Sequence, residues 1–501
     1  MQSRRPLGER EEYRACGRVP LNAPAHTVAI VGAGFCGTVL ARELLRRAHD
    51  QPLRVLLIDR APAGRGVAYA RRRHPYLLNV PAGRMSASVA DPGEFLRFAR
   101  KVWPRATSDD YLPRALYGDY LEAALAGAAR LSAPQVRLEH ICGEVIALDG
   151  MRRGSRLRLH LADGSCLESD AVVLAPGNPP PARLPGTEHL GDTARYIADP
   201  WASEPAVRAG ETVLLIGTGL TMADVVLAGS AQPTRRTPTF HALSRRGLLP
   251  APQTRLPPAS GSEDRRVLLR SAATSLLQLW RTVRGLSQEH QARGGDWREA
   301  VALVRAVAPS LWQQLGPAER RRFLRHVRPY WDLHRHRLPA SSAAALQELQ
   351  RSGHLHLHAG RLLGLERAGR KIRALWQPRS QITRQVLLVD RVINCTGPDY
   401  DLRRTADRLL RSLIAQGLAV PDPLGLGLAT GAQGALLSAS GHAAERVFYL
   451  GPLLRATHWE STAVAELREH AAQLARRLLQ AQCAAHAAVV PPRAAAQRLR
   501  A

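Results

Sequence analysis

Hydrophobic and polar positions first form a regular pattern near residue 27, where an apolar run leads into a glycine-rich turn. In chain order the pattern contains an apolar run, the turn, a helical stretch and a second apolar run that ends in an acid: 27–31, Gly32, Gly34, Gly37, 38–45, 53–58 and Asp59. Strand, glycine turn, helix, strand and acid in this order are the fingerprint of a dinucleotide-binding unit. The pattern therefore predicts such a unit.

Each position of this fingerprint has a physical role. Gly32 permits a tight turn, Gly34 lets the backbone approach a pyrophosphate, and Gly37 lets the helix pack closely on the strand. The N-terminus of the helix adds unpaired N–H groups and a partial positive charge. Asp59 can accept hydrogen bonds from an adenosine ribose. The first unit therefore suits FAD or NAD.

A second unit follows with the same order of elements. The apolar run 211–216 leads into Gly217 and Gly219, whereas Met222 stands where the third glycine is expected. A further apolar run at 239–243 supplies the second strand. We therefore expect a second βαβ unit, with a weaker fingerprint than the first.

The residues after this second strand distinguish the two units. In the first unit the first glycine and the acid are 27 positions apart, and the same 27 positions lead from Gly217 to Ser244, which precedes Arg245 and Arg246. A carboxylate would repel a 2′-phosphate, whereas arginine can bind it with two hydrogen bonds. The second unit therefore suits NADPH, unless the two arginines are simply solvated.

Two more apolar runs end in glycine, 170–175 before Gly177 and 390–394 before Gly397. Both have the form of the strand-to-glycine crossings that link nucleotide domains in flavoproteins with two dinucleotide sites. Each follows a dinucleotide unit at a plausible distance. We therefore expect Gly397 to contribute to the FAD site.

The region from about 250 to 340 has a helical pattern. Apolar positions recur at Ala272, Leu276, Leu279 and Val283 within 271–283, and the pattern continues over 297–307. A last helix is predicted at about 461–482. The expected organisation is an N-terminal extension, a first part of an FAD domain, an NAD(P)H domain with a helical insertion, a second part of the FAD domain and a flexible tail: 1–25, 26–207, 208–389 with the insertion at about 250–340, 390–483 and 484–501.

Length and charge narrow the classes of protein. A chain of 501 residues exceeds one ordinary domain. The net charge is +28, yet only Lys101 and Lys371 are lysines, and the arginines form no dense basic block. We therefore expect no nucleic-acid partner. The N-terminus has no apolar region of a signal peptide and no run of 18 apolar residues occurs, which favours a cytoplasmic protein without a membrane partner.

The cysteines exclude some chemistry. The six cysteines are far apart, and no C-x-x-C occurs, so a zinc ribbon and a dithiol disulfide reductase are both disfavoured. The alternation of His354, His356 and His358 places three imidazoles on one strand face. Three imidazoles on one flat strand reach a single metal ion poorly, so we expect a half-exposed strand and no metal.

Longer motifs carry a resemblance to a known family. They are VAIVGAGFCGTVLARELL, GRGVAYA, LLNVPAGRMSA, GTGLTMADVVL, HALSRRGLLP, YWDLHRHR, VINCTGP and LGPLLRATHWESTAVAELREHAAQLA. Over residues 27–479 the chain resembles the bacterial FAD/NAD(P)-binding protein family, which includes a FAD-dependent urate hydroxylase and is distantly related to class B flavin monooxygenases. The resemblance implies an α/β fold with two Rossmann-like domains of the glutathione-reductase type, FAD on the first and NAD(P)H on the second.

The resemblance also implies further FAD contacts. It places Asn79, Arg84 and Met85 near the flavin ring, and Asn79 is an amide able to bond the isoalloxazine edge, although an ordinary polar surface loop remains the alternative. It places Gly451 and Pro452 where FAD passes over the start of a helix. We expect that helix to begin near Ser461 or Thr462, either of which can cap it.

The densest group of reactive side chains lies at 330–337 near the end of the helical region. Its candidates for contact with an anionic or heteroaromatic substrate are Trp331, Asp332, His334, Arg335 and His336. The alternative is a structural ridge in which Asp332 pairs with Arg335 or His336. No catalytic nucleophile or acid–base pair can be assigned.

These features predict an FAD-dependent oxidoreductase that uses NADPH. Its most favoured activity is hydroxylation of a small organic substrate with O₂ through a C4a-hydroperoxyflavin, with the cofactor carrying the chemistry. The alternatives are a reductase that passes electrons to another acceptor and a nucleotide-sensing protein without turnover. The substrate and the oligomeric state are not determined by the sequence.

Overall fold

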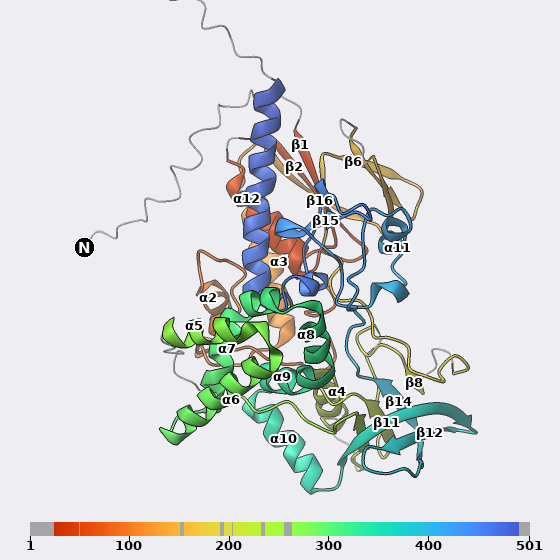
Figure 1. The fold of residues 1–501 in the computed structure, drawn as a ribbon. Coiled ribbons are helices and arrows are strands. Elements are labelled where there is room, and N and C mark those ends of the chain that lie inside the picture. The colour runs from red at the N-terminus through yellow and green to blue at the C-terminus, as the bar shows by residue number, and fades with distance from the viewer. Residues whose placement is uncertain are drawn as a thin grey trace, which may run out of the picture.

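The computed structural model describes residues 25–49, 51–150, 155–190, 195–202, 204–231, 236–254 and 263–489. Two large sheets with helices packed on them form two nucleotide-type domains (Figure 1). The predicted extension at 1–25 and the segment 490–501 lie outside the described residues, except for residue 25.

The first sheet combines strands from both ends of the chain. Its order is β15-β16-β7-β1-β2-β3. The strands are β1 (His26–Val31), β2 (Leu53–Asp59), β3 (Val136–Cys142), β7 (Ala171–Leu174), β15 (Ala435–Leu437) and β16 (Ala443–Tyr449). β16 runs parallel to β7, so the C-terminal part of the chain completes the sheet that the N-terminal part begins.

Helices bury the apolar face of this sheet. They are α1 (Phe35–Arg47), α2 (Glu94–Ala99), α3 (Arg114–Leu131) and α12 (Val464–Val489). Val28, Leu40, Tyr117 and Leu474 belong to one core cluster and are at most 1% exposed, which joins β1, α1, α3 and α12. On the other face lie α11 (Arg408–Ala415) and a small sheet of β4 (Val145–Asp149), β5 (Leu157–Leu161) and β6 (Cys166–Ser169).

The second sheet has the order β13-β12-β11-β10-β9-β14-β8. Its strands are β8 (Tyr196–Ile197), β9 (Thr212–Ile216), β10 (Thr239–Ser244), β11 (Leu355–Ala368), β12 (Lys371–Pro378), β13 (Gln385–Val389) and β14 (Arg391–Asn394). Its core cluster packs α4 (Leu220–Ser230) and α10 (Ala340–Arg351) on the sheet. Strands β8, β14, β9, β10 and β11 are parallel, as expected for a doubly wound unit.

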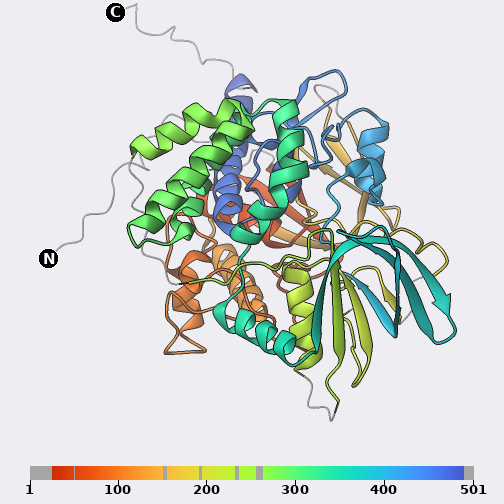
Figure 2. The same cartoon turned by 60° about the horizontal axis from the view of Figure 1, so that its bottom comes forward.

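The helical insertion leaves the second domain after β10 and returns to it before α10. Its helices are α5 (Glu263–Ser271), α6 (Leu276–Ala292), α7 (Trp297–Gln314), α8 (Pro317–Arg322) and α9 (Arg328–Arg335), with a π-helical turn at Phe323–Val327. Figures 1 and 2 show these helices in green beside the end of α12 where that helix begins. The ion pair Arg305–Glu466, at 2.8 Å between α7 and α12, fixes this contact.

Three expectations about element boundaries are wrong. The helical pattern at 271–283 is interrupted, because Ser275 is in an extended conformation and α6 begins at Leu276. The run at 390–394 was placed with the FAD domain, yet β14 pairs with β9 in the second sheet, because its register continues the parallel ladder of that sheet. The predicted tail from residue 484 begins as helix, since α12 continues to Val489.

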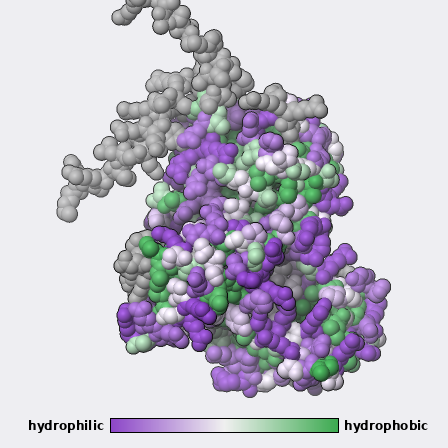
Figure 3. All heavy atoms as spheres, in the orientation of Figure 1, coloured by the Kyte–Doolittle hydropathy of each residue, from purple (hydrophilic) through white to green (hydrophobic). Residues whose placement is uncertain are grey.

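Apolar residues are interspersed with hydrophilic ones on the face of the molecule seen in Figure 3. No helix within the described ranges is long and apolar enough to cross a bilayer.

Candidate functional site

The two glycine turns have the same backbone hydrogen bonds. The amide of Gly32 donates to Ile58 O at 2.7 Å, and that of Gly217 donates to Leu243 O at 2.8 Å. In both turns this glycine has a positive φ, 106° for Gly32 and 112° for Gly217. Each therefore turns the chain sharply between its strand and the helix that follows.

A side chain at either position would collide with the neighbouring crossing strand. A Cβ on Gly32 would lie 2.2 Å from Ala175 O, and one on Gly217 would lie 2.3 Å from Cys395 O. Contacts this short with backbone atoms cannot be relieved by a rotamer change. Both glycines are thus required by the close approach of two strands as well as by their own conformation.

The first glycine turn leads into a helix N-terminus that can accept a phosphate. Gly34 caps α1 without a side-chain hydrogen bond, and the first turn of α1 contains no acidic residue. A Cβ on Gly34 would lie 3.6 Å from the Cα of Gly66, so two backbone segments flank the turn closely. A helix N-terminus of this kind is suited to a pyrophosphate.

The segment around Gly66 is fixed against α3. Gly64 N donates to Ala33 O at 2.8 Å, which ties this loop to the first turn. The guanidinium of Arg65 is paired with Asp119 and Glu122 of α3, and these pairs raise its pKa against the effect of burial. The GRGVAYA motif therefore supports the glycine turn from the side.

Asp59 lies at the end of β2, where its carboxylate serves the turn itself. It accepts hydrogen bonds from Ala33 N at 2.6 Å and from Ala61 N at 3.0 Å. Ser244 lies at the matching end of β10, where its hydroxyl accepts from Gly247 N at 2.9 Å and bonds the Thr218 hydroxyl at 3.0 Å. The second turn thus replaces a charged group by a neutral one.

The two arginines after Ser244 differ in their surroundings. Arg245 is exposed. Arg246 is half-buried, donates to the Tyr330 hydroxyl at 3.1 Å, and has its guanidinium carbon 4.8 Å from the centre of that ring. Arg246 is therefore tied to α9, whereas Arg245 extends towards solvent.

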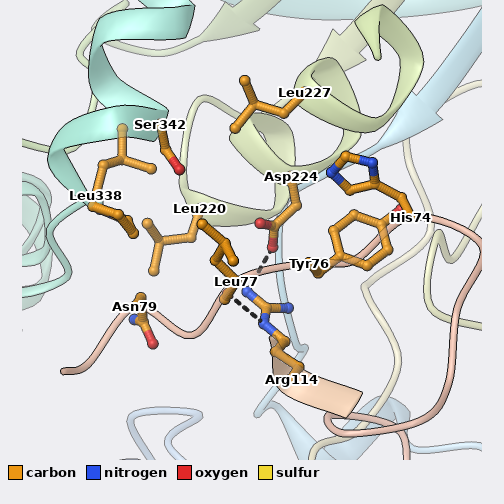
Figure 4. Close-up of a pocket in the computed structure, with 11 residues that line it drawn as sticks. His74, Tyr76, Leu77, Asn79, Arg114, Leu220, Asp224, Leu227, Leu338 and Ser342 are labelled. Carbon is orange, nitrogen blue, oxygen red and sulfur yellow. Dashed lines mark hydrogen bonds and ion pairs between the residues drawn. The ribbon is translucent and has the colours of Figure 1, made fainter. Parts of the chain in front are cut away.

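The Asn79 loop borders the second domain. Its backbone is held by Leu78 N donating to Leu112 O at 2.9 Å. Asn79 lines a pocket together with Leu220, the first residue of α4, and Leu338 (Figure 4). Of the other residues expected at the flavin, Met85 is buried and Arg84 is exposed.

An ion pair crosses this pocket between the two domains. Arg114 at the start of α3 donates to the Asp224 carboxylate of α4 at 2.7 Å and to Leu77 O at 3.1 Å (Figure 4). Burial raises the pKa of Asp224, and the pairing with Arg114 opposes that rise. The other residues that line the pocket are His74, Tyr76, Leu227, Pro339 and Ser342.

The C-terminal glycine turn follows β16. Gly451 has a φ of 145°, and a Cβ there would lie 2.9 Å from the Tyr449 hydroxyl. Pro452 is buried and opens a short 3₁₀ helix, Pro452–Ala456. Gly397 lies after β14 with a φ of 81°, two residues after Cys395, whose carbonyl oxygen lies against Gly217 of the second glycine turn. Its contribution to the FAD site stays a prediction.

The expected N-cap of the last helix is wrong. α12 begins at Val464, and Ala463 O accepts its first helical hydrogen bond from Leu467 N at 3.0 Å. Ser461 and Thr462 lie in the preceding turn, where Ser461 N donates to His458 O at 3.0 Å. The cap positions follow the geometry of this turn rather than the preference of the hydroxyl side chains.

The segment 330–337 divides into two halves. In the first half, Trp331 packs between the apolar clusters of the insertion and of Trp459. Asp332 accepts a hydrogen bond from Arg328 Nε at 3.2 Å, one turn back along α9, so its partner differs from the Arg335 or His336 of the alternative structural ridge. His334 bonds Tyr330 O at 2.7 Å.

The second half faces the FAD-type domain. Arg335 donates to Glu460 at 2.8 Å; the Glu460 side chain is buried, and that of Arg335 is 12% exposed. Burial, with Arg335 beside it, lowers the pKa of His336 to about 3, so the imidazole is neutral near pH 7. Burial also lowers the pKa of Arg337 to about 10, with Arg298 and Arg335 acting in the same direction.

The histidines of β11 lie against β10. His358 bonds His241 at 3.0 Å, and the His356 ring stacks on His241 at 4.8 Å. Within the described residues no group of three or more His, Cys, Asp or Glu side chains has the arrangement of a metal site.

Several residues of the domain junction are not indicated by the sequence. Arg114 and Asp224 are 110 positions apart, and Glu460 lies 125 positions from its partner Arg335, which was a candidate. Arg455, which is buried with its guanidinium 4.1 Å from the Trp459 ring, also carried no signal. Pairs of this kind are set by tertiary packing, and a single sequence has no local pattern for them.

One family model matches the first unit. Residues 29–179 match the model of the family described as FAD-NAD(P)-binding. No curated protein sequence matches the chain. The expected resemblance and the FAD and NAD(P) cofactors are thereby confirmed over this part of the chain.

Solved structures share the whole fold. The chain resembles the reduced form of ornithine hydroxylase from Pseudomonas aeruginosa with a TM-score of 0.59 and 18% identity, covering 91% of this chain and 99% of that one. The ornithine N-hydroxylase of Kutzneria sp. 744 matches with a TM-score of 0.61 and 15% identity, covering 92% of this chain and 100% of that one. L-lysine 6-monooxygenase from Pseudomonas syringae matches with a TM-score of 0.59 and 16% identity, covering 91% of this chain and 100% of that one.

At these identities the likeness establishes the fold, and the predicted α/β class with two dinucleotide-binding domains is confirmed. Residues 29–179 therefore match an FAD-NAD(P)-binding family model, within a fold that the chain shares with these solved structures.

Proposed function

We propose that the chain is an FAD-dependent, NADPH-utilising oxidoreductase, and specifically a monooxygenase that hydroxylates a small organic substrate. The observation that carries this proposal is the repetition of one glycine turn with two different polar residues at the end of its second strand. Asp59 occupies that place in the first unit, and Ser244 followed by Arg245 occupies it in the second. Two sites with opposite charge preference suit two different dinucleotides.

The first turn fits FAD. Gly34 and Gly66 bring two backbone segments close together at the turn, and the N-terminus of α1 offers N–H groups to a pyrophosphate. Asp59 already orders the turn and presents its carboxylate to an adenosine ribose. When bound, FAD accepts electrons from NADPH and delivers them to O₂ or another acceptor.

The second turn fits NADPH. Gly219 caps α4 without a side-chain hydrogen bond, and the first turn of α4 has no acidic residue. The neutral Ser244 hydroxyl and the exposed Arg245 guanidinium suit a 2′-phosphate. The pocket between Leu220 and Asn79 connects the start of α4 with the loop assigned to the flavin, and the nicotinamide half would approach the flavin along it.

The hydroxylation step is supported by the neighbours of this fold. The Kutzneria structure is named as a complex with reduced FAD, NADP⁺ and L-ornithine, and its name describes an ornithine N-hydroxylase. The insertion at α5–α9 covers the junction of the two domains and can keep bulk water away from it. A dry junction favours productive use of reduced cofactor over its loss.

The test is rapid mixing of the FAD-loaded protein with NADPH or NADH without oxygen. We expect fast bleaching of the flavin absorption with NADPH and much slower bleaching with NADH. After oxygen is admitted with a substrate, the product should carry one oxygen atom from ¹⁸O₂. Rapid turnover with a dye and no label in the product would instead support a reductase, and a bound flavin that neither cofactor reduces would support a nucleotide sensor.

A further inference from the structure

Arg337 is an arginine at the domain junction whose charge is incompletely hydrogen-bonded. It lies two residues after the end of α9 and is half-buried. Its Nε and Nη1 atoms are buried, and among the residues that the structure describes they have no hydrogen-bond partner. A buried guanidinium with unbonded N–H groups is costly unless a ligand completes it.

The acids near Arg337 are already paired with other arginines. Asp296 accepts two hydrogen bonds from the Arg298 guanidinium, at 2.9 and 3.1 Å, and one from the backbone N of Arg298. Glu460 is paired with Arg335 at 2.8 Å. A carboxylate from outside the chain is therefore the natural partner of Arg337.

Asp332 does not balance this charge either. It is bonded to Arg328, and its second oxygen lies 3.9 Å from Arg455, which is itself buried. His336 is neutral near pH 7, because burial holds its pKa low, so it adds no charge of either sign. Glu460 is thus engaged by Arg335, and Asp332 by Arg328 and Arg455.

The surroundings of Arg337 lead to the loop assigned to the flavin. Tyr111 lies within electrostatic range of both Arg337 and Arg84, and its hydroxyl is bonded by Gln253. The next residue after Arg337, Leu338, lines the pocket with Asn79. An anion held at Arg337 would therefore lie between the insertion and this loop.

We propose that Arg337 binds the carboxylate of an anionic small-molecule substrate, with the Tyr111 hydroxyl as a second donor, so that the enzyme acts on carboxylate-bearing substrates. This proposal rests on the proposed function, because it places the substrate beside the flavin. A guanidinium binds a carboxylate with two parallel hydrogen bonds, and this geometry fixes orientation as well as charge. Arg335 then acts as a positioning residue, since its pair with Glu460 anchors the end of α9.

Benzoate and its neutral analogue benzamide test the proposal on the FAD-loaded protein. The readout is the change in flavin absorption, with formate and acetate as smaller probes. We expect saturable changes with carboxylates and none with benzamide. Arg337→Gln should weaken carboxylate binding at least about tenfold, which corresponds to a lost charged hydrogen bond. Arg337→Lys should retain part of it.

The matched control is Arg325→Gln, which removes an exposed arginine from the same insertion and should bind benzoate as the wild type does. The unfolding temperature of Arg337→Gln without ligand should equal or exceed that of the wild type, because the variant removes an incompletely bonded charge. Benzoate should raise the unfolding temperatures of the wild type and of Arg325→Gln, but not that of Arg337→Gln.

Three outcomes overturn the proposal: no saturable change with any carboxylate, equal binding of benzamide, or wild-type binding by Arg337→Gln. If NADP⁺ rather than benzoate loses affinity in Arg337→Gln, the arginine holds a cofactor phosphate and the proposal also fails. Anaerobic reduction by NADPH is measured in parallel. A flavin that NADPH does not reduce contradicts the proposed function, whereas normal reduction without carboxylate binding contradicts this inference alone.

Discussion

The two dinucleotide units of this chain are copies in backbone and different in side chains. Asp170 accepts a hydrogen bond from Thr27 N at 2.8 Å, and Asp390 accepts one from Thr212 N at the same distance. In both units the first residue of the turn donates to the end of the second strand. The difference in ligand must therefore come from the side chains placed on this common frame.

Two positions carry that difference. A Cβ on Gly37 would lie 1.9 Å from Gly32 O, so α1 packs directly on its turn, whereas the second unit has the fully buried Met222 at the matching place. Asp59 in the first unit corresponds to Ser244 in the second. The first unit thus has a closely packed glycine and a carboxylate where the second has a buried methionine and a hydroxyl.

The first test of the comparison sets Gly32→Ala beside Gly217→Ala. Both add a Cβ against a backbone oxygen at a positive φ, so both turns must shift. Gly32→Ala should lose at least about tenfold in FAD affinity, since strain of this kind exceeds about 1.4 kcal/mol. The flavin-to-protein absorbance ratio of the purified variants measures this loss.

Gly217→Ala is the control for Gly32→Ala. It should remain yellow and keep its bound FAD, but NADPH should reduce that FAD far more slowly. Equal loss of FAD in both variants would mean that the two turns do not serve separate cofactors.

The second test exchanges the acid at the end of the strand. Ser244→Asp copies Asp59, and its carboxylate can accept the same backbone N–H from Gly247 that Ser244 accepts at 2.9 Å. It should raise the KM for NADPH about 100-fold by repelling the 2′-phosphate, a free-energy change of about 2.7 kcal/mol. The KM for NADH should change little, and steady-state kinetics with both cofactors measure the ratio. An unchanged ratio would remove Ser244 from the 2′-phosphate site.

The third test separates the two arginines. Arg245→Gln should lower kcat/KM for NADPH about tenfold, because an exposed guanidinium is available to a phosphate. Arg246→Gln should cost about threefold or less, since Arg246 is already engaged by Tyr330. Equal effects of both variants would show that the Tyr330 contact does not keep Arg246 from the cofactor. Tyr330→Phe, which removes only the hydroxyl bond, is the control.

Features of this molecule that depend on neighbouring residues were predicted from the sequence, whereas features that depend on distant residues were not. The glycine turns, their strands and the ends at Asp59 and Ser244 were all predicted, because local spacing and period decide them. The sheet that receives β14 was not, because two parallel apolar strands offer no local sign of their partner. The start of α12 was predicted wrongly for a related reason, because Ser461 and Thr462 form part of the turn that precedes the helix.

The candidate substrate region shows the same limit. The segment 330–337 was noticed for its composition, but only the fold separates Trp331 and His334, which pack within the insertion, from Arg335 and Arg337. Whether an arginine is available to bind a ligand depends on which acids lie near it in space. In a chain with net charge +28 that information is absent from composition.

The smallest expected effect concerns a histidine of the second sheet that has a leucine counterpart in the first. His241 on β10 occupies the place of Leu56 on β2, since each pairs with the matching position of the preceding strand, Leu214 and Ala29. Burial, with His358 and His356 nearby, lowers the pKa of His241 to about 4. The unfolded chain binds a proton near pH 6.5, so stability is lost as the pH falls from that value towards 4.

His241→Leu should therefore reduce the loss of stability between neutral pH and about pH 5. Because His241 is half-buried and water screens it, we expect the drop in unfolding temperature to shrink by only about 2–4 °C. Calorimetry of both proteins at the two pH values measures the difference. The slope should not vanish, because His470 on α12 also has a pKa lowered to about 4 by burial and penalises acid in the same direction. If the unfolding temperature falls equally with pH in the variant and the wild type, His241 takes up its proton as readily in the folded protein as in the unfolded chain. Its position would then not be equivalent to the buried position of Leu56 in the first sheet.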